Sequence, residues 1–163
     1  MKKYLPLGLF LLIVILLWRG LGLHPNLIPS PLINKPVPTS RSVFLGQVTL
    51  LNVFASWCEA CAEEQGFLNQ LAKNNKVRII GFNYKDTPLK AKAWLKQYGN
   101  PYQNIMVDSK GETAIDWGIY GTPETFVIDK KGIIRYKVLG AISPDLWEET
   151  LGPLILKLES ETL

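Results

Sequence analysis

The longest apolar run in the chain lies at its N-terminus. Residues 4–18 contain no charge, two lysines precede them, and beyond Arg19 the apolar character continues to residue 23. A span over residues 4–23 has 20 residues, about the length that a helix needs to cross a bilayer. The first alanine of the chain is Ala55, so a signal-peptide cleavage site of the A-x-A type is hard to place after the run. The pattern predicts an uncleaved, single-pass membrane anchor over residues 1–23.

The flanks of this anchor indicate which side of the membrane the remainder occupies. Lys2, Lys3 and the terminal amine outweigh Arg19, so the positive-inside rule leaves the N-terminus in the cytoplasm and sends the rest outward, into an oxidising compartment. Five of the eleven prolines then fall between residues 25 and 38. We expect residues 24–38 to be an extended linker and residues 39–163 to be one folded domain.

Within that domain, short β-type runs alternate with helical patterns. Buried strands are expected over 47–55 and 77–84, a short third strand over 105–107 and a hairpin over 125–128 and 133–139. Helices are expected over 59–75, from Thr87-Pro88 to Tyr98, and from Ser143-Pro144 onward. Parallel βαβ units followed by a hairpin and a helix predict an α/β fold with a mixed central sheet and helices on both faces. This order resembles a thioredoxin-like fold with an inserted strand and helix.

Charge argues against a nucleic-acid-binding function. The whole chain has 18 basic and 14 acidic residues, but the predicted anchor contains three of the basic ones and no acidic one. The domain outside the membrane therefore has 15 basic and 14 acidic residues, a net charge of about +1. A balance this even gives no electrostatic attraction for a phosphate backbone.

The two cysteines of the chain, Cys58 and Cys61, are the strongest chemical signal. A zinc site would need four ligands, and the sole histidine, His24, lies far upstream, so one chain cannot assemble such a site. A purely structural disulfide is the plainer alternative, but closing a four-residue loop removes little unfolded-state entropy. The spacing favours a redox-active disulfide Cys58-Cys61 that opens and closes, with no metal or other cofactor.

The residues on either side of the pair indicate which sulfur attacks. The strand ends and the helix begins at Cys58, where free backbone N–H groups and the helix dipole favour a thiolate. Cys61 lies inside the first helical turn and is expected to be shielded. We therefore expect Cys58 to be the nucleophile and Cys61 the resolving thiol.

Trp57-Cys58-x-x-Cys61 after such a strand resembles the thioredoxin superfamily, and three further stretches sharpen the match. The segments 81–86 (GFNYKD), 118–126 (GIYGTPETF) and 132–136 (GIIRY) look like the membrane-anchored DsbE/CcmG thiol:disulfide oxidoreductases of cytochrome c maturation. The resemblance implies a catalytic domain in the periplasm, held on the bacterial inner membrane. It implies reduction of the CxxCH disulfide of apocytochrome c, with electrons from a membrane thiol reductant of the DsbD type.

The resemblance also assigns roles around the cysteines. Pro123 matches the family's cis-proline that faces the disulfide, with Thr122 before it, and Glu64 and Glu124 match acidic residues beside the active site. The plainer alternative for Pro123 is an ordinary trans turn proline before a strand. Taken alone, Glu64 would more often be a solvated helix carboxylate and Glu124 a strand-edge charge. A carboxylate close to Cys58 disfavours the thiolate and tunes the potential.

Two aromatic residues and two departures from the family pattern complete the prediction. Trp57 and Tyr84, with Thr122, are expected to contact the substrate, although both aromatics also suit a core.

Glu59-Ala60 stands between the cysteines where the family commonly has proline, and it adds a negative charge beside the nucleophile. Asn52 takes the place of the buried acid of thioredoxins, which leaves the proton acceptor for Cys61 open among Glu64, Glu124 and water.

Three functions therefore compete. The leading one is a reductase for apocytochrome c. The second is a general extracytoplasmic dithiol oxidoreductase, because the motif determines the reaction type and not the substrate. The third is a tethered binding module for unfolded haem-acceptor segments, with the disulfide incidental. A peroxidase is disfavoured because Ala55 and Leu51 stand where peroxiredoxins have Thr or Ser and Pro.

Overall fold

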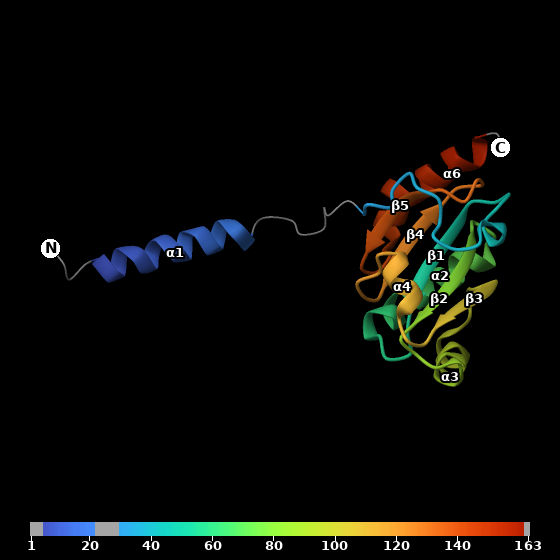
Figure 1. The fold of residues 1–163 in the computed structure, drawn as a ribbon, viewed down its shortest axis with the longest axis horizontal. Coiled ribbons are helices and arrows are strands. Elements are labelled where there is room, and N and C mark those ends of the chain that lie inside the picture. Colours follow the sequence, from blue (N-terminus) through green and yellow to red (C-terminus); the bar gives the residue numbers. More distant parts are fainter. Residues whose placement is uncertain (1–4, 22–29, 162–163) are drawn as a thin grey trace.

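The computed structural model describes residues 5–21 and 30–161 and builds the domain around a mixed sheet (Figure 1). The strands are β1 (Thr49–Phe54), β2 (Arg78–Tyr84), β3 (Asn104–Asp108), β4 (Glu124–Ile128) and β5 (Ile134–Leu139). They lie in the order β3-β2-β1-β4-β5, with β1, β2 and β3 parallel and with β4 antiparallel to β1 and β5. The predicted thioredoxin-like α/β fold with a mixed sheet is confirmed.

Strand β1 lies at the centre because its sequence has no solvent-facing side. All six of its residues are buried, as expected for a continuous apolar run between two neighbouring strands. Its two polar residues are Thr49 and Asn52, and Asn52 pairs in register with Gly81 on β2 and Thr125 on β4. The side chain of Asn52 must therefore find its hydrogen bonds inside the protein.

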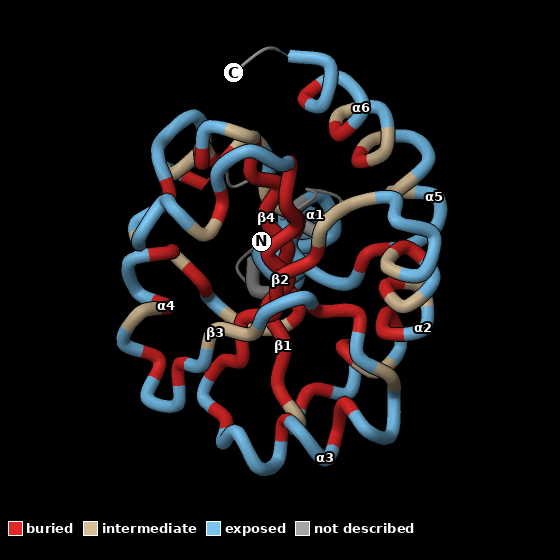
Figure 2. Tube along the Cα trace, turned by 90° about the vertical axis from the view of Figure 1, so that its right-hand side faces the viewer, coloured by how far each residue is buried: buried red, intermediate tan, exposed pale blue. Residues whose placement is uncertain are grey.

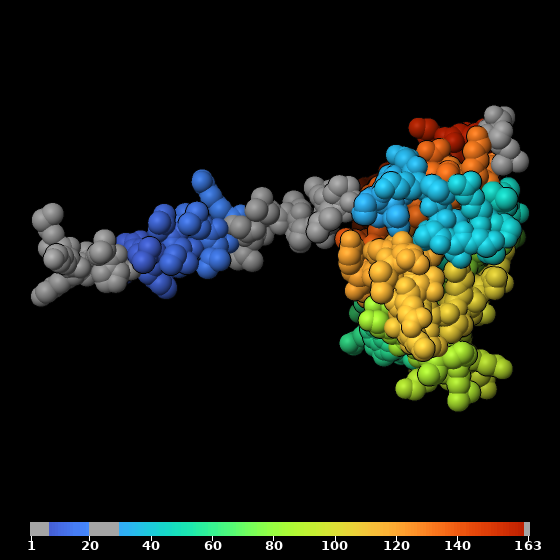
Figure 3. Space-filling view, in the orientation of Figure 1, coloured from blue at the N-terminus to red at the C-terminus, as the bar shows by residue number. Residues whose placement is uncertain are grey.

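Helices cover both faces of the sheet. On one face, α2 (Glu59–Lys73), α3 (Pro88–Tyr98) and α6 (Gly152–Ser160) pack over a core that includes both cysteines, Leu68, Trp94 and Ile155. On the other face, α4 (Glu112–Asp116) and the segment before β1, which contains the 3-10 helix η3 (Arg41–Val43), cover a second core around Trp117. Figure 2 shows the buried strands between these two layers, and Figure 3 shows the pre-β1 segment beside the α4 region on the outer surface.

Two predicted helix starts are confirmed by their caps. The Thr87 and Ser143 side chains accept hydrogen bonds from the N–H groups of Lys90 and Leu146. The final helix, predicted as one element, is instead α5 (Pro144–Leu146), a π-helical turn η4 (Trp147–Leu151) and α6. Pro153 has no N–H to continue an α-helical ladder, and the Gly152 N–H reaches back to the Trp147 carbonyl instead.

Helix α4 was not predicted because its five residues are too few to show a period. A single carboxylate organises its start. Asp108, at the end of β3, accepts hydrogen bonds from the N–H groups of Gly111, Glu112 and Ala114 at 2.8–3.1 Å. The acid therefore satisfies N–H groups that a helix start leaves free.

The N-terminal segment is helical where the structure describes it. Helix α1 (Leu5–Leu21) has exposed apolar side chains between Leu7 and Trp18. No helix in residues 5–21 or 30–161 has both the length and the apolar character that a membrane crossing requires. The predicted anchor and the question of its cleavage extend to residues 1–4 and 22–23, which lie outside the described residues.

The described part of the predicted linker, residues 30–38, packs on the domain instead of extending from it. Pro36 pairs with Ile133 in an isolated antiparallel bridge, and the Asn34 N–H donates to the Ile134 carbonyl at 2.7 Å. Val37 is buried in the core around Trp117. The buried Val37 side chain and the bridge to Ile133 thus attach this segment to the sheet. The folded unit therefore starts before residue 39.

Candidate active site

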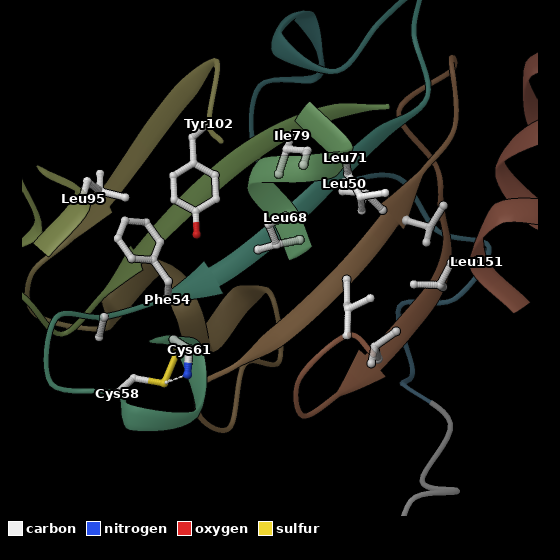
Figure 4. Close-up of a cluster of buried hydrophobic side chains, with 14 of the residues drawn as sticks. Leu50, Phe54, Cys58, Cys61, Leu68, Leu71, Ile79, Leu95, Tyr102 and Leu151 are labelled. Atoms are coloured by element: carbon white, nitrogen blue, oxygen red, sulfur yellow. Dashed lines mark hydrogen bonds between the residues drawn. A yellow bond between two sulfur atoms is a disulfide. The ribbon is translucent and has the colours of Figure 1, made fainter. Parts of the chain in front are cut away.

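Cys58 and Cys61 form the predicted disulfide at the junction of β1 and α2. Cys58 is the N-cap of α2 and has extended backbone angles, and its Sγ accepts a hydrogen bond from the Cys61 N–H at 3.1 Å (Figure 4). Cys58 is 6% exposed and Cys61 is fully buried. The sulfur predicted to attack is therefore the more accessible of the two, and it lies where a helix start favours negative charge.

The loop before Cys58 is fixed by a carboxylate from another part of the chain. Asp86, just after β2, accepts hydrogen bonds from the N–H and the hydroxyl of Ser56 at 2.8 and 2.9 Å. It also accepts from the Asn83 side chain and the Thr87 N–H. Burial raises the pKa of Asp86, but these hydrogen bonds outweigh it and the net pKa is below the ordinary value. A charged Asp86 thus ties the active-site loop to the end of β2.

Trp57 has the exposure expected of a contact residue. Trp57 is 57% exposed, while its indole N–H donates to the Lys85 carbonyl at 3.1 Å. One end of the side chain is thereby held by the turn that also contains Asp86. The indole presents a fixed apolar surface next to Cys58.

The segment with the predicted cis-proline enters β4 beside β1. The Thr122–Pro123 peptide bond is cis, as the resemblance implies. The Pro123 carbonyl accepts a hydrogen bond from the Gly140 N–H at 2.9 Å, and the Thr122 hydroxyl is buried with no partner among the described residues. Because β4 pairs with β1, Pro123 enters the sheet beside the strand that leads to Cys58.

Glu64 is not a solvated helix carboxylate: it is buried under α2, one helical turn after Cys61. Its two oxygens accept hydrogen bonds from the Asn52 side-chain amide at 2.9 Å and from the Ile142 N–H at 2.7 Å. Burial raises the pKa of Glu64 from 4.5 to about 7, and the two hydrogen bonds oppose this shift only in part. A carboxyl poised near neutrality therefore lies behind the disulfide.

A buried polar network sets the orientation of Asn52. The Tyr102 hydroxyl donates to Asn52 Oδ1 at 2.7 Å, which leaves the Asn52 amide to donate to Glu64 and to the Thr125 hydroxyl. Burial raises the pKa of Tyr102, and the nearby Glu64 charge adds to this shift. The sequence indicated that Asn52 replaces an acid, but nothing local pointed to Tyr102, which lies 50 positions away.

Glu124 is buried too, but on the other face of the sheet. Phe126 and Ile128, two and four positions further along β4, lie in the core around Trp117, whereas Val127 lies in the core with the cysteines. The Glu124 carboxylate forms an ion pair with Lys137 at 2.9 Å. The expected action of Glu124 on Cys58 is therefore opposed by a neighbouring positive charge, and Glu64 is the acid on the side of the disulfide.

Tyr84 is not brought to the disulfide. It is buried at the end of β2, in the core around Trp117, which lies on the opposite face of the sheet from the two cysteines. Of the two interpretations given above, a substrate contact and a core aromatic, its packing agrees with the core aromatic.

A cavity of about 700 Å³ lies away from the disulfide, and neither cysteine lines it. It is formed by α3 and β3, with Ala91, Leu95 and Ile105 in its wall and Lys92 and Lys96 at its rim. The reactive groups are therefore next to an exposed tryptophan and not inside this cavity. An open surface of this kind suits a polypeptide substrate better than a small molecule.

Comparison with known proteins agrees with this geometry. The Redoxin family matches residues 28–151. The thiol:disulfide interchange protein DsbE of Allochromatium vinosum is 43% identical, over 97% of this chain and 94% of its own, and that of Escherichia coli is 42% identical, over 96% and 95%. A crystal structure described as that of a DsbE protein from Chlorobium tepidum superposes with a TM-score of 0.61 at 29% identity, covering 72% of this chain and 83% of that one.

Proposed function

This chain belongs to the Redoxin family as a DsbE-type thiol:disulfide interchange protein, and from that premise we propose that it reduces the CxxCH disulfide of apocytochrome c before haem attachment. The observation that carries the proposal is the Cys58–Cys61 disulfide at a helix start, with the exposed Trp57 next to Cys58 in the chain and cis-Pro123 at the entry to β4, the strand that pairs with β1. This arrangement offers one reactive sulfur to an extended polypeptide. The wider class, a thiol:disulfide oxidoreductase, follows from the family itself.

In the proposed reaction, the Cys58 thiolate attacks one sulfur of the substrate disulfide. The substrate S–S bond breaks, a mixed disulfide forms on Cys58, and one substrate thiolate leaves. Cys61 then attacks the Cys58 sulfur and releases the second substrate thiolate. The two electrons that reduce the substrate come from the two thiols of this protein, which end as the Cys58–Cys61 disulfide.

The second step needs a group that takes the proton of Cys61, and we assign this role to Glu64. Glu64 lies one turn further along α2, and residues at this spacing have Cβ atoms about 5–6 Å apart. Its pKa of about 7 allows it to accept and return a proton near neutral pH. Glu124, the other acidic candidate, lies on the opposite face of the sheet and is paired with Lys137.

The proposed site of action is the periplasmic side of the bacterial inner membrane. The apolar run of residues 4–23, of which α1 is the described part, supports attachment to the membrane. In that compartment the oxidised protein needs a new supply of electrons, which we assign to a membrane thiol reductant of the DsbD type. Mass analysis of membrane and soluble fractions tests the attachment, because a soluble product starting near residue 24 would contradict an anchor.

A peptide experiment tests the reaction. The prereduced protein is mixed with an oxidised apocytochrome c peptide containing CxxCH, and peptide thiols are counted over time. Wild type should reduce the peptide, Cys58→Ser should not, and Cys61→Ser should accumulate a mixed disulfide on Cys58.

The same experiment separates the three candidate functions. Equal rates with an unrelated disulfide peptide would favour a general oxidoreductase. Tight binding of the peptide without thiol release, retained in the Cys58→Ser variant, would favour a binding module and contradict the proposed reaction.

A further inference from the structure

The ion pair between Glu124 and Lys137 is the only one among the described residues in which both side chains are buried, at 4% and 5% exposure. The two residues lie on adjacent antiparallel strands, where Lys137 is opposite Phe126 and Glu124 is two positions before Phe126. Removing two charges from water is unfavourable, and a buried pair often stabilises a fold no better than apolar residues of similar volume. A contribution to stability alone therefore does not account for this buried pair.

Both charges contact the same short segment of the chain. The N–H groups of Tyr120 and Gly121 donate to Glu124 Oε1 at 2.9 and 3.2 Å. Lys137 Nζ donates to the Gly118 carbonyl at 2.7 Å and lies 4.6 Å from the centre of the Tyr120 ring. The pair thus fixes residues 118–121 at three backbone groups and one ring.

This segment leads directly into the cis Thr122–Pro123 bond, and Tyr120 is 70% exposed. A large exposed ring normally moves freely, but here the ammonium group of Lys137 lies against it. The backbone and the ring that precede Pro123 are therefore positioned by a lysine two strands away from the strand that leads to Cys58.

We propose that Lys137 is a positioning residue for recognition of the polypeptide substrate, acting through Glu124 and Tyr120 on the segment that precedes Pro123. This inference rests on the proposed function and adds a residue to it. The opposite charges of the pair largely cancel at a distance, and they lie on the face of the sheet away from Cys61. Lys137 should therefore act on substrate binding and not on the redox couple.

Steady-state kinetics with the oxidised CxxCH peptide, together with the reduction potential, test this role. Lys137→Met should raise the KM for the peptide about tenfold, with kcat and the potential close to wild type. Lys137→Arg, which keeps the positive charge and donors for Gly118, should restore most of the affinity. Lys131→Met removes an exposed lysine of the same hairpin and controls for the loss of one positive charge.

Lys137→Met leaves Glu124 buried without its partner and can weaken the fold. The double variant Glu124→Gln/Lys137→Met avoids an unpaired charge, and its KM should rise to the same extent. An unchanged KM in the folded double variant, or a changed kcat or reduction potential, would overturn the proposal.

Failure of the proposed function gives a different result. If wild type reduces an unrelated disulfide peptide but not the CxxCH peptide, the proposed substrate is wrong, and the KM comparison is made with the peptide that is reduced.

Discussion

The side chain of Asn52, on the central strand, donates a hydrogen bond to Glu64 on α2 at 2.9 Å. This contact joins β1, the strand that leads to the cysteines, to α2, the helix whose N-cap is Cys58. Asn52 donates and does not accept here, because its carbonyl oxygen already receives the Tyr102 hydroxyl. The buried Glu64 carboxyl therefore accepts hydrogen bonds from one amide and from the Ile142 N–H. Together these two bonds lower its pKa by less than burial raises it.

The first prediction is that Glu64 makes the stability of the oxidised protein depend on pH. Burial raises its pKa from 4.5 to about 7, so in this window the folded protein holds a proton that the unfolded chain has lost. Stability should therefore fall as the pH rises from about 4.5 to 7. Glu64→Gln cannot titrate, and between pH 4.5 and 8 it should lose about 3 kcal/mol less than wild type in urea unfolding.

A neighbouring carboxylate provides the control for this measurement. Glu63 lies on the exposed side of the same helix, and Glu63→Gln should follow the wild-type dependence on pH. A Glu64→Gln variant with the wild-type dependence would show that Glu64 does not hold a proton in the folded state.

The second prediction concerns Asp86, whose carboxylate holds the loop before Cys58. Asp86→Ala leaves the N–H of Ser56 without its acceptor and should destabilise the protein by about 2–3 kcal/mol. It should also speed hydrogen exchange at the Ser56 amide. Because the pKa of Asp86 is below 3.8 in the folded state, its contribution is present above that pH and lost as the pH falls further.

Asp116→Ala removes an exposed carboxylate and serves as the control for Asp86. Unfolding measurements on both variants report the loss of stability, and amide exchange on both reports the opening of the loop at Ser56. Wild-type exchange at Ser56 in Asp86→Ala would mean that the loop keeps its conformation without the carboxylate.

A third prediction is that Cys58 is the sulfur accessible to reagents. In the disulfide form Cys58 is 6% exposed and Cys61 is 0% exposed, and Cys58 is the residue at the helix start. Limiting iodoacetamide added to the reduced protein should therefore modify Cys58 first, as mapped by mass spectrometry of its peptides. Preferential modification of Cys61 would reverse the two assigned roles.

The parts of this fold that local sequence determines were predictable. The apolar run of β1 and the caps Thr87 and Ser143 depend on residues within a few positions of each other. The position of the cysteines at the end of β1 follows from the same local pattern. These features gave the sheet, most helices and the place of the disulfide.

The polar contacts of the site were not predictable, because their partners are distant in the sequence. Glu64 receives hydrogen bonds from residues 12 and 78 positions away, and Asp86 contacts a residue 30 positions away. Lys137 lies in a predicted strand, where a lysine ordinarily points to solvent. Only the antiparallel pairing of β4 with β5 brings it to Glu124.

The fourth prediction concerns Glu59, the exposed carboxylate that follows Cys58 in the first turn of α2. Its negative charge disfavours the Cys58 thiolate and so disfavours the reduced form. Glu59→Ala should therefore raise the reduction potential, by about 5–20 mV for an exposed charge pair of about 0.2–1 kcal/mol. Equilibration with glutathione measures the potential, with Glu63→Gln as the control. A potential that falls would give Glu59 a role other than repulsion of the thiolate.

The last prediction tests Glu64 as the proton acceptor for Cys61. In the mixed disulfide, the Cys61 thiol must lose its proton before it attacks Cys58, and the carboxyl one turn away becomes able to take it as the pH passes about 7. The rate at which wild type releases a peptide from the mixed disulfide should therefore rise through pH 7. In Glu64→Gln the release rate at pH 7.5 should be at least about tenfold lower than in wild type. This rate should rise only where a thiol ionises without a base, at about pH 8.5 or above. Stopped-flow measurement of peptide release gives both profiles, and Glu63→Gln should retain the wild-type profile. If Glu64→Gln also retained it, water would take the proton of Cys61 and Glu64 would have no part in the second step.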